Sequence, residues 1–190
     1  MTTTVLAYLL IICYFIIERF LRKGKKAISL KAGESDRGSS QLIWISGLFG
    51  IFLVMSAPIL NAYQFGYWNS AYIGWVGILL TLGGLILRYW AAKILGEFYT
   101  RTLQIVEGQR IVDRGPYSII RHPGYLGTLG MEIGASLPVS NWAVLLVIAI
   151  VGVLSRVYRI QAEEEMLETS FEEQYKVYLE KTWRLIPFIY

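Results

Sequence analysis

The stretch from Gly38 to Leu87 contains fifty consecutive residues without a Lys, Arg, Asp or Glu. A helix of a water-soluble domain needs a polar face, so a run of this length has no place in a soluble fold. Residues 1–17 also lack charge, and residues 122–155 hold only Glu132. With 55% hydrophobic and 17% charged residues, the chain is predicted to be an all-α integral membrane protein.

The apolar runs predict about five transmembrane helices. Crossing about 30 Å of hydrocarbon takes about 20 residues, and the fourth run is shorter, rising only about 22 Å at about 1.5 Å per residue. We therefore expect it to form a half-span, or one arm of a tight helical hairpin with the fifth, and residues 137–141 to supply the turn. The predicted spans are Thr4 to Phe20, Gln41 to Leu60, Tyr72 to Ala92, Pro123 to Leu137 and Asn141 to Tyr158.

The distribution of basic residues predicts the orientation. Residues 19–37, after the first run, are rich in Lys and Arg, whereas residues 61–71 carry no charge. The positive-inside rule then places the first loop and the C-terminus in the cytoplasm and the N-terminus outside. A cleaved signal peptide is the competing interpretation, but residues 1–5 contain no positive charge. The net charge of +4 lies in loops beside the membrane, which favours anionic lipid headgroups over nucleic acid as the partner.

The number of cysteines excludes a fold held together by disulfides or by cysteine-bound zinc. Cys13 is the single cysteine and lies in an apolar run, where a buried thiol is the usual state. A disulfide scaffold and a cysteine-based zinc site are therefore excluded, and no metal site is predicted.

The most distinctive polar segment surrounds His122, the only histidine. Pro123 suits the first position of a helix, which places His122 at the N-cap beside Arg121. Free amides and the positive end of the helix dipole make such a position suitable for a carboxylate or phosphate. Simple anchoring at the headgroup level is the alternative.

Small residues follow on the same predicted helix. Gly124, Gly127, Gly130 and Gly134 favour close helix packing over ligand approach, and the last two have GxxxG spacing. Glu132 is interpreted as a protonated or Arg-paired structural carboxyl.

A second polar segment follows the fifth span. Arg159 and Glu163 lie one helical turn apart and can pair, although a solvated charge run is the alternative for glutamates 163–165. An amphipathic C-terminal helix is predicted, along the interface or capping the bundle, with a stripe that we assign to packing. Its apolar residues are Leu167, Phe171, Tyr175, Tyr178 and Leu179.

Five motifs occur in order: Gly-Pro-Tyr at 115–117, Arg-His-Pro-x-Tyr-x-Gly at 121–127, Arg-x-x-x-Glu-Glu-x-x-Leu at 159–167, Phe-x-x-x-Tyr-x-x-Tyr at 171–178 and Arg-Leu-Ile-Pro at 184–187. Together they resemble the isoprenylcysteine carboxyl methyltransferase family and its phospholipid methyltransferase relatives, over about residues 95–187. Because no linker or repeat divides the chain, residues 1–190 are predicted to form a single membrane domain, with three spans in residues 1–92. The resemblance implies that residues 93–190 form its cofactor-binding and catalytic part.

What the resemblance implies is an S-adenosylmethionine-dependent methyltransferase with its active site facing the cytoplasm. Glu172 follows Phe171 where relatives often have glycine, a difference expected to affect helix geometry more than chemistry. Lys181 stands near a position where some relatives have arginine. Arg184 and Glu164 are the candidate catalytic residues. The positions implied to hold or support the cofactor are Tyr117, Arg121, His122, Tyr125, Arg159, Glu163 and Glu164.

The methyl acceptor stays open at this point. A lipophilic acceptor such as an isoprenylcysteine-like carboxylate fits the resemblance, as do a phospholipid amine, a thiol or an isoprenoid acid. The bilayer is the expected partner, and the sequence indicates no obligatory protein partner. The absence of a Gly-x-Gly-x-x-Gly motif after a strand excludes a Rossmann-like cofactor site. An NADPH-dependent membrane reductase and a non-catalytic membrane protein are the alternatives from other functional classes.

Overall fold

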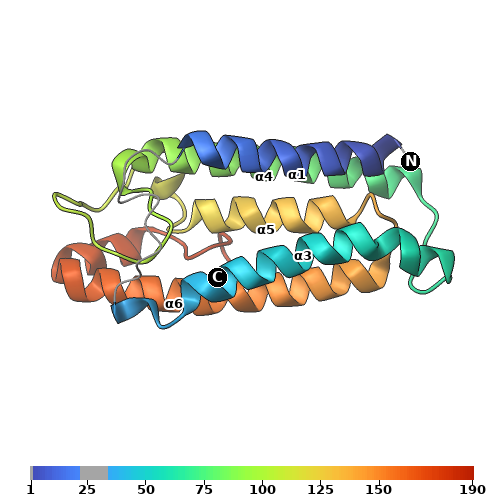
Figure 1. The fold of residues 1–190 in the computed structure, drawn as a ribbon. Coiled ribbons are helices and arrows are strands. Elements are labelled where there is room, and N and C mark those ends of the chain that lie inside the picture. The colour runs from blue at the N-terminus through green and yellow to red at the C-terminus, as the bar shows by residue number, and fades with distance from the viewer. Residues whose placement is uncertain (1, 22–33) are drawn as a thin grey trace.

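The chain forms a bundle of helices that run along one common axis (Figure 1). The computed structural model describes residues 2–21 and 34–190. Its long helices are α1 (Thr2–Leu21), α3 (Ser39–Ala62), α4 (Ala71–Leu95), α5 (Pro123–Ser136) and α6 (Trp142–Lys181). Short 3-10 turns are η1 (Glu34–Asp36), η2 (Gly96–Phe98) and η3 (Gly115–Ser118). The predicted all-α membrane fold is confirmed.

The helices are arranged as two pairs around a short central helix. In Figure 1, α1 lies beside α4 and α3 lies beside α6, with α5 between the pairs. In the described part of the chain, α1, α3, α4 and α6 are long and apolar enough to cross a membrane. The 14 residues of α5 rise only about 21 Å. It is therefore a half-span, as its sequence predicted.

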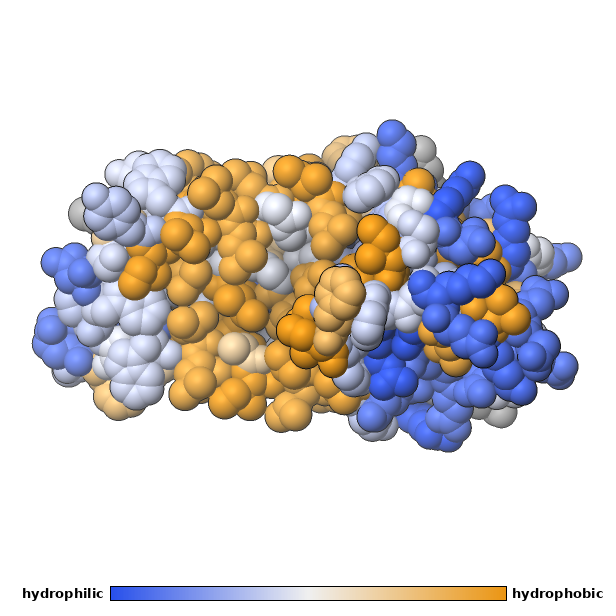
Figure 2. Space-filling model, turned by 180° about the vertical axis from the view of Figure 1, so that it is seen from behind, coloured by the Kyte–Doolittle hydropathy of each residue, from blue (hydrophilic) through white to orange (hydrophobic). Residues whose placement is uncertain are grey.

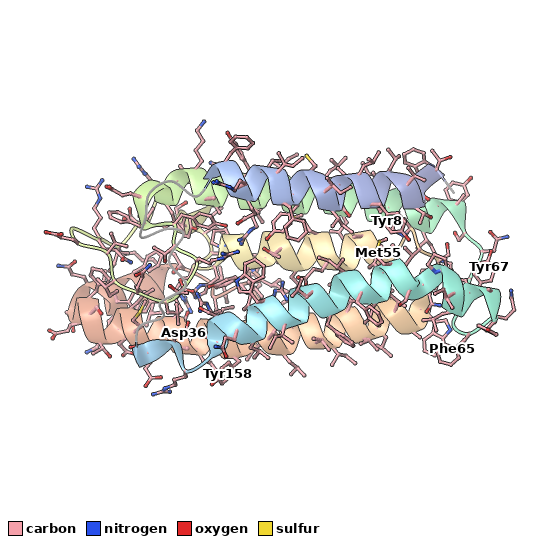
Figure 3. The ribbon with its side chains drawn as sticks, viewed as in Figure 1. Tyr8, Asp36, Met55, Phe65, Tyr67 and Tyr158 are labelled. Carbon is pink, nitrogen blue, oxygen red and sulfur yellow. The ribbon has the colours of Figure 1, made fainter. Side chains whose placement is uncertain are left out.

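The surface matches a protein embedded in a bilayer. On the face seen in Figure 2, a broad apolar belt crosses the middle of the molecule and one end is strongly hydrophilic. Phe65 and Tyr67 mark the opposite end from Asp36 (Figure 3). Exposed rings there include Tyr63 and Tyr72, at 81% and 86% exposure, and amphipathic aromatic rings of this kind are typical of the membrane–water interface.

Helices α4 and α5 pack so closely that their backbones touch. A Cβ atom on Gly84 would lie 2.5 Å from the Gly127 carbonyl oxygen, and one on Gly77 would lie 2.5 Å from the Gly134 carbonyl oxygen. The predicted role of the glycine face in close packing is thus confirmed for Gly127 and Gly134. The contacting pair is not the one with GxxxG spacing, because a Cβ atom on Gly130 would meet nothing nearer than 3.8 Å.

The predicted hairpin between α5 and α6 is also confirmed. Asn141 caps α6, with its Oδ1 accepting from the Val144 amide at 3.0 Å. Its Nδ2 donates to Asn61 Oδ1 and to the Phe65 carbonyl, both at 2.8 Å. One buried side chain therefore fixes both the hairpin turn and the end of α3.

Helix α6 is much longer than a membrane span. The 30 residues before the bend at Glu172, numbers 142–171, rise about 45 Å, about one and a half times the hydrocarbon thickness. The predicted C-terminal amphipathic helix therefore begins as a continuation of the fifth span, and the bend at Glu172 separates its last part from that span. At Glu172 the backbone leaves the helical region, with φ 44° and ψ −116°. Beyond this bend the chain turns back toward the start of α5 (Figure 1), so Glu172 does affect helix geometry.

Candidate active site

A cavity of about 690 Å³ lies inside the bundle near its hydrophilic end. Cofactor and ligand sites commonly measure about 300–1,000 Å³, so this volume is sufficient for both a cofactor and part of an acceptor. The cavity is polar where α5, α6 and the C-terminal half of α4 meet. It becomes apolar toward α1 and α3, where its walls include Ile11, Phe15, Leu48, Ile51 and Val54.

The start of α5 forms one wall of the polar part. His122 is the N-cap and Pro123 the first helical residue, as predicted. The Arg121 amide donates to the Trp183 carbonyl at 2.8 Å, and the His122 amide donates to the Arg184 carbonyl at 3.2 Å. The Arg-His-Pro motif and the terminal Arg-Leu-Ile-Pro motif are therefore adjacent in space.

Glu164 is the centre of a charged cluster that joins these motifs to α6. Arg121 Nε lies 2.8 Å and His122 Nε2 lies 3.2 Å from Glu164 Oε1. Arg184 Nη2 lies 2.7 Å from the other oxygen, Oε2. The Glu164 side chain is only 9% exposed, so these partners replace the water that its charge would otherwise need. We refer to Arg121, His122, Glu164 and Arg184 as the Glu164 cluster.

A second network runs through Arg159. The Tyr125 hydroxyl donates to Glu163 Oε2 at 2.6 Å and accepts from Arg159 Nε at 2.9 Å. Arg159 Nη1 forms an ion pair with Asp36 at 2.8 Å and also donates to Ser40 Oγ at 2.7 Å. The predicted pairing of Arg159 with Glu163 is therefore corrected: Tyr125 stands between them, and the charge of Arg159 is met by Asp36.

Sequence reasoning missed Asp36, which lies in η1 just before α3. Its carboxylate accepts from the Ser40 amide and hydroxyl and from the Leu103 amide. Burial alone would raise the pKa of Asp36, but the Ser40 hydrogen bonds and the charge of Arg159 outweigh burial and hold that pKa below its ordinary value. An acidic residue just before an apolar helix is an N-capping signal, and this signal could have identified it.

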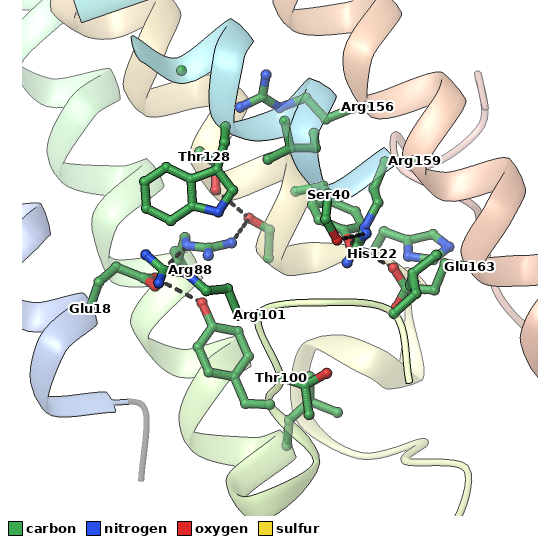
Figure 4. Close-up of a pocket in the computed structure, with 18 of the residues that line it drawn as sticks. Glu18, Ser40, Arg88, Thr100, Arg101, His122, Thr128, Arg156, Arg159 and Glu163 are labelled. Atoms are coloured by element: carbon green, nitrogen blue, oxygen red, sulfur yellow. Dashed lines mark hydrogen bonds and ion pairs between the residues drawn. The ribbon is translucent and has the colours of Figure 1, made fainter. Parts of the chain in front are cut away.

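A third polar group, also missed, faces the cavity from the opposite side (Figure 4). Arg88 Nε forms a buried ion pair with Glu18 at 2.8 Å, and the Tyr99 hydroxyl donates to the same Glu18 oxygen at 2.8 Å. Arg88 Nη1 also donates to the Gly124 carbonyl at 3.1 Å. In sequence, Glu18 and Arg88 each terminate an apolar run, and nothing local distinguishes them from charges that merely flank a span.

The structure divides the predicted site residues into two groups. Glu164 and Arg184 lie behind the cavity wall, and Arg184 is further occupied by Tyr190, whose hydroxyl lies 3.1 Å from Nη1. The second group of predicted site residues lies in the cavity wall and consists of Tyr117, Arg121, His122, Tyr125, Arg159 and Glu163. Within this group, burial raises the pKa of the Tyr117 hydroxyl well above its ordinary value, so that this phenol stays protonated.

The model of the isoprenylcysteine carboxyl methyltransferase (ICMT) family matches residues 75–169, which is half of the chain. The chain belongs to the ICMT family. The matched region includes α5, the first part of α6 and most of the cavity wall, and it agrees with the resemblance that the ordered motifs indicated.

Individual relatives of this chain extend the comparison. A probable protein-S-isoprenylcysteine O-methyltransferase of Oryza sativa subsp. indica is 30% identical over 127 residues, covering 65% of this chain and 64% of the relative. The uncharacterized protein YpbQ of Bacillus subtilis is 25% identical over 147 residues, covering 77% of this chain and 83% of that protein. This chain thus spans slightly less than two thirds of the length of its rice relative.

A solved structure of the eukaryotic intramembrane Ras methyltransferase ICMT has the same fold. The two superpose with a TM-score of 0.62 at 23% identity, over 79% of this chain and 53% of the other. At this identity the likeness concerns the arrangement of helices, and it agrees with the membrane bundle described above.

Proposed function

We propose that this ICMT-family chain is a membrane-embedded methyltransferase that uses S-adenosylmethionine and acts on a lipophilic acceptor, such as the carboxylate of an isoprenylcysteine-like substrate. One observation carries the proposal: a single cavity joins a charged, tyrosine-rich end to an apolar end between α1 and α3. A polar donor and an apolar acceptor can therefore meet inside one space.

The chemistry of the polar end fits the donor. S-adenosylmethionine carries an ammonium, a carboxylate and an adenine, and when bound it supplies an activated methyl group. Glu163 offers a carboxylate to the ammonium, and Arg121 with the N-terminal end of α5 offers cationic and dipolar groups to the carboxylate. The rings of Tyr117 and Tyr175, which also line the cavity, offer flat faces to the adenine.

The contribution of the chain to methyl transfer is positional. Transfer from a sulfonium needs in-line approach and exclusion of water, and it needs no covalent bond to the protein. The Glu164 cluster fixes Arg121 and His122, and the Arg159 network fixes Tyr125 and Glu163. Both sets of cavity-wall groups are thus held by buried partners before any ligand arrives, which is the preorganisation that such a reaction requires.

Arg184 is better assigned to positioning than to the acceptor. Its guanidinium is paired with Glu164 and packs over the Tyr190 ring, at 5.0 Å from the centroid, and it does not line the cavity. Arg184→Ala should therefore weaken cofactor binding, as Glu164→Gln should. A raised KM for the acceptor with unchanged cofactor affinity would restore its assignment to the acceptor.

Cofactor binding is the direct test. Calorimetry with S-adenosylhomocysteine on purified protein in detergent should show binding, and His122→Ala and Glu164→Gln should weaken it. Losing a hydrogen bond to a charged group costs about 1.5–3 kcal/mol, which is a loss in affinity of about 10- to 150-fold.

Glu165 provides a matched control beside Glu164. Its exposed carboxylate pairs with Arg37 outside the cavity, so Glu165→Gln should bind the cofactor normally. Comparable losses in Glu164→Gln and Glu165→Gln would remove the site assignment. Tight NADPH binding without any response to S-adenosylhomocysteine would replace the proposal with a reductase.

A further inference from the structure

An ion pair lies much deeper in the bundle than the groups assigned to the cofactor. Arg156 Nη2 on α6 is 2.5 Å from Glu132 Oε1 on α5. Glu132 follows the N-cap His122 by ten residues, which places it about 15 Å further along the helix axis. Arg156 lies in α6, one of the helices that are long and apolar enough to cross a membrane, so the pair lies among the membrane-spanning segments.

Both members of the pair form part of the cavity wall. In Figure 4, Arg156 lies at the far end of the cavity from Thr100. The Arg156 side chain is 2% exposed, whereas that of Glu132 is 21% exposed although α5 is the central helix. The cavity accounts for that exposure. The buried Nε of Arg156 has no hydrogen-bond partner among the described residues.

Holding the fold together does not explain this pair. α5 and α6 are consecutive helices, and their turn is already fixed by Asn141. A buried ion pair is often no more stabilising than apolar residues of the same size. Ionisable groups at membrane depth usually face a cavity and take part in function. The Glu18–Arg88 pair differs, because it joins α1 to α4, two helices that are distant in sequence.

We infer that Glu132 and Arg156 bind a neutral hydrogen-bonding group, such as a hydroxyl or amide, carried on the acceptor chain at the depth of this pair, about 15 Å along the α5 axis from His122. This inference rests on the proposed function and narrows its substrate class. The charges of the pair cancel, so a neutral group completes its hydrogen bonds without adding charge in a low-dielectric region. A plain hydrocarbon chain would exclude water from the pair without forming any hydrogen bond to it.

The test compares two synthetic S-alkyl cysteine acceptors of equal chain length, one plain and one with a hydroxyl at the depth of the pair. The wild-type protein should favour the hydroxylated acceptor by about 10-fold or more in kcat/KM. Glu132→Met combined with Arg156→Met should abolish that preference. Arg37→Met combined with Glu165→Met removes an exposed Arg–Glu pair outside the cavity and should leave the preference intact.

A second variant covers the case in which the double substitution prevents folding. Glu132→Gln keeps the size of the side chain but leaves Arg156 with an unbalanced charge. It should shift the preference toward an acceptor carrying a second carboxylate in place of the hydroxyl, an effect that a merely structural pair would not produce. Lack of any preference in the wild-type protein, or an unchanged preference in both Glu132 variants, would overturn the inference.

Failure of the proposed function would look different. In that case S-adenosylhomocysteine would not bind, and neither acceptor would be methylated. Binding of both S-alkyl cysteines can still be measured, by displacement of a brominated analogue that quenches Trp44 in the cavity wall. Tighter binding of the hydroxylated compound, lost in the double variant, would then support the site without any methyl transfer.

Discussion

Glu172 occupies a backbone conformation that suits glycine, so Glu172→Gly should stabilise the protein. With φ 44° and ψ −116°, the residue lies in a region that side chains other than glycine rarely adopt. Such a conformation costs about 1–3 kcal/mol. Glycine removes this strain but adds about 0.4–1 kcal/mol of unfolded-state entropy. The difference lies between about 0 and 2.6 kcal/mol. At its midpoint, about 1.3 kcal/mol, it should raise Tm by about 3–5 °C in a chain of this size.

Glu173 offers a control of the same residue type at the next position. It is exposed like Glu172, but its backbone stays helical, and it pairs with Lys176 at 3.4 Å. Glu173→Gly should therefore cost about 1 kcal/mol in helix propensity. Thermal unfolding of both variants in the same detergent gives shifts of opposite sign if the bend is as described. A similar fall in Tm for the two variants would refute the reasoning.

Three other properties can be checked on the same preparations. Gly127→Ala should lower Tm, because its Cβ atom would lie 2.7 Å from a backbone oxygen of α4, whereas Gly130→Ala should be tolerated. The lowered pKa of Asp36 contributes stability that is complete above about pH 4 and is lost as the pH falls further, so Asp36→Asn should lower Tm at pH 7 more than at pH 3. In a Cys13→Ser background, labelling of intact cells should find Arg110→Cys and a C-terminal cysteine on the same, cytoplasmic face, and labelling on opposite faces would contradict the proposed orientation.

Features that depend on neighbouring residues could be predicted from the sequence. Span limits follow from runs of apolar residues, and the first four observed helices begin and end within a few residues of them. Helix α6 begins where the fifth span was predicted to begin, but it continues to Lys181, well past the predicted end at Tyr158. The position of His122 at the N-cap follows from the proline after it, and the hairpin turn follows from residues 137–141. The short length of α5 could be predicted from the number of residues in its apolar run alone.

Features that depend on distant residues could not be predicted. Asp36 meets Arg159 across 123 positions, and Glu18 meets Arg88 across 70. Each of these charges stands near the end of an apolar run, where a loop charge and a cavity charge look the same. The spacing of Arg159 and Glu163 permitted a direct pair, but a better-placed carboxylate from η1 met the arginine instead. The ordered motifs located the site, but they did not show that Arg184 stands behind Glu164.

The backbone contact between α4 and α5 determines which helices around the cavity can move apart. Where main chains touch, as at Gly84 and Gly127, no side chain can rotate aside, so these two helices must move as one body. The other walls, α1 and α3, pack mainly against α4 and α6 respectively. They are joined to each other where the Tyr8 hydroxyl donates to the Val54 carbonyl at 3.3 Å (Figure 3). A bulky lipid entering from the side should therefore separate α1 from α3, and residues at that junction should govern how fast lipids exchange without changing the reaction itself.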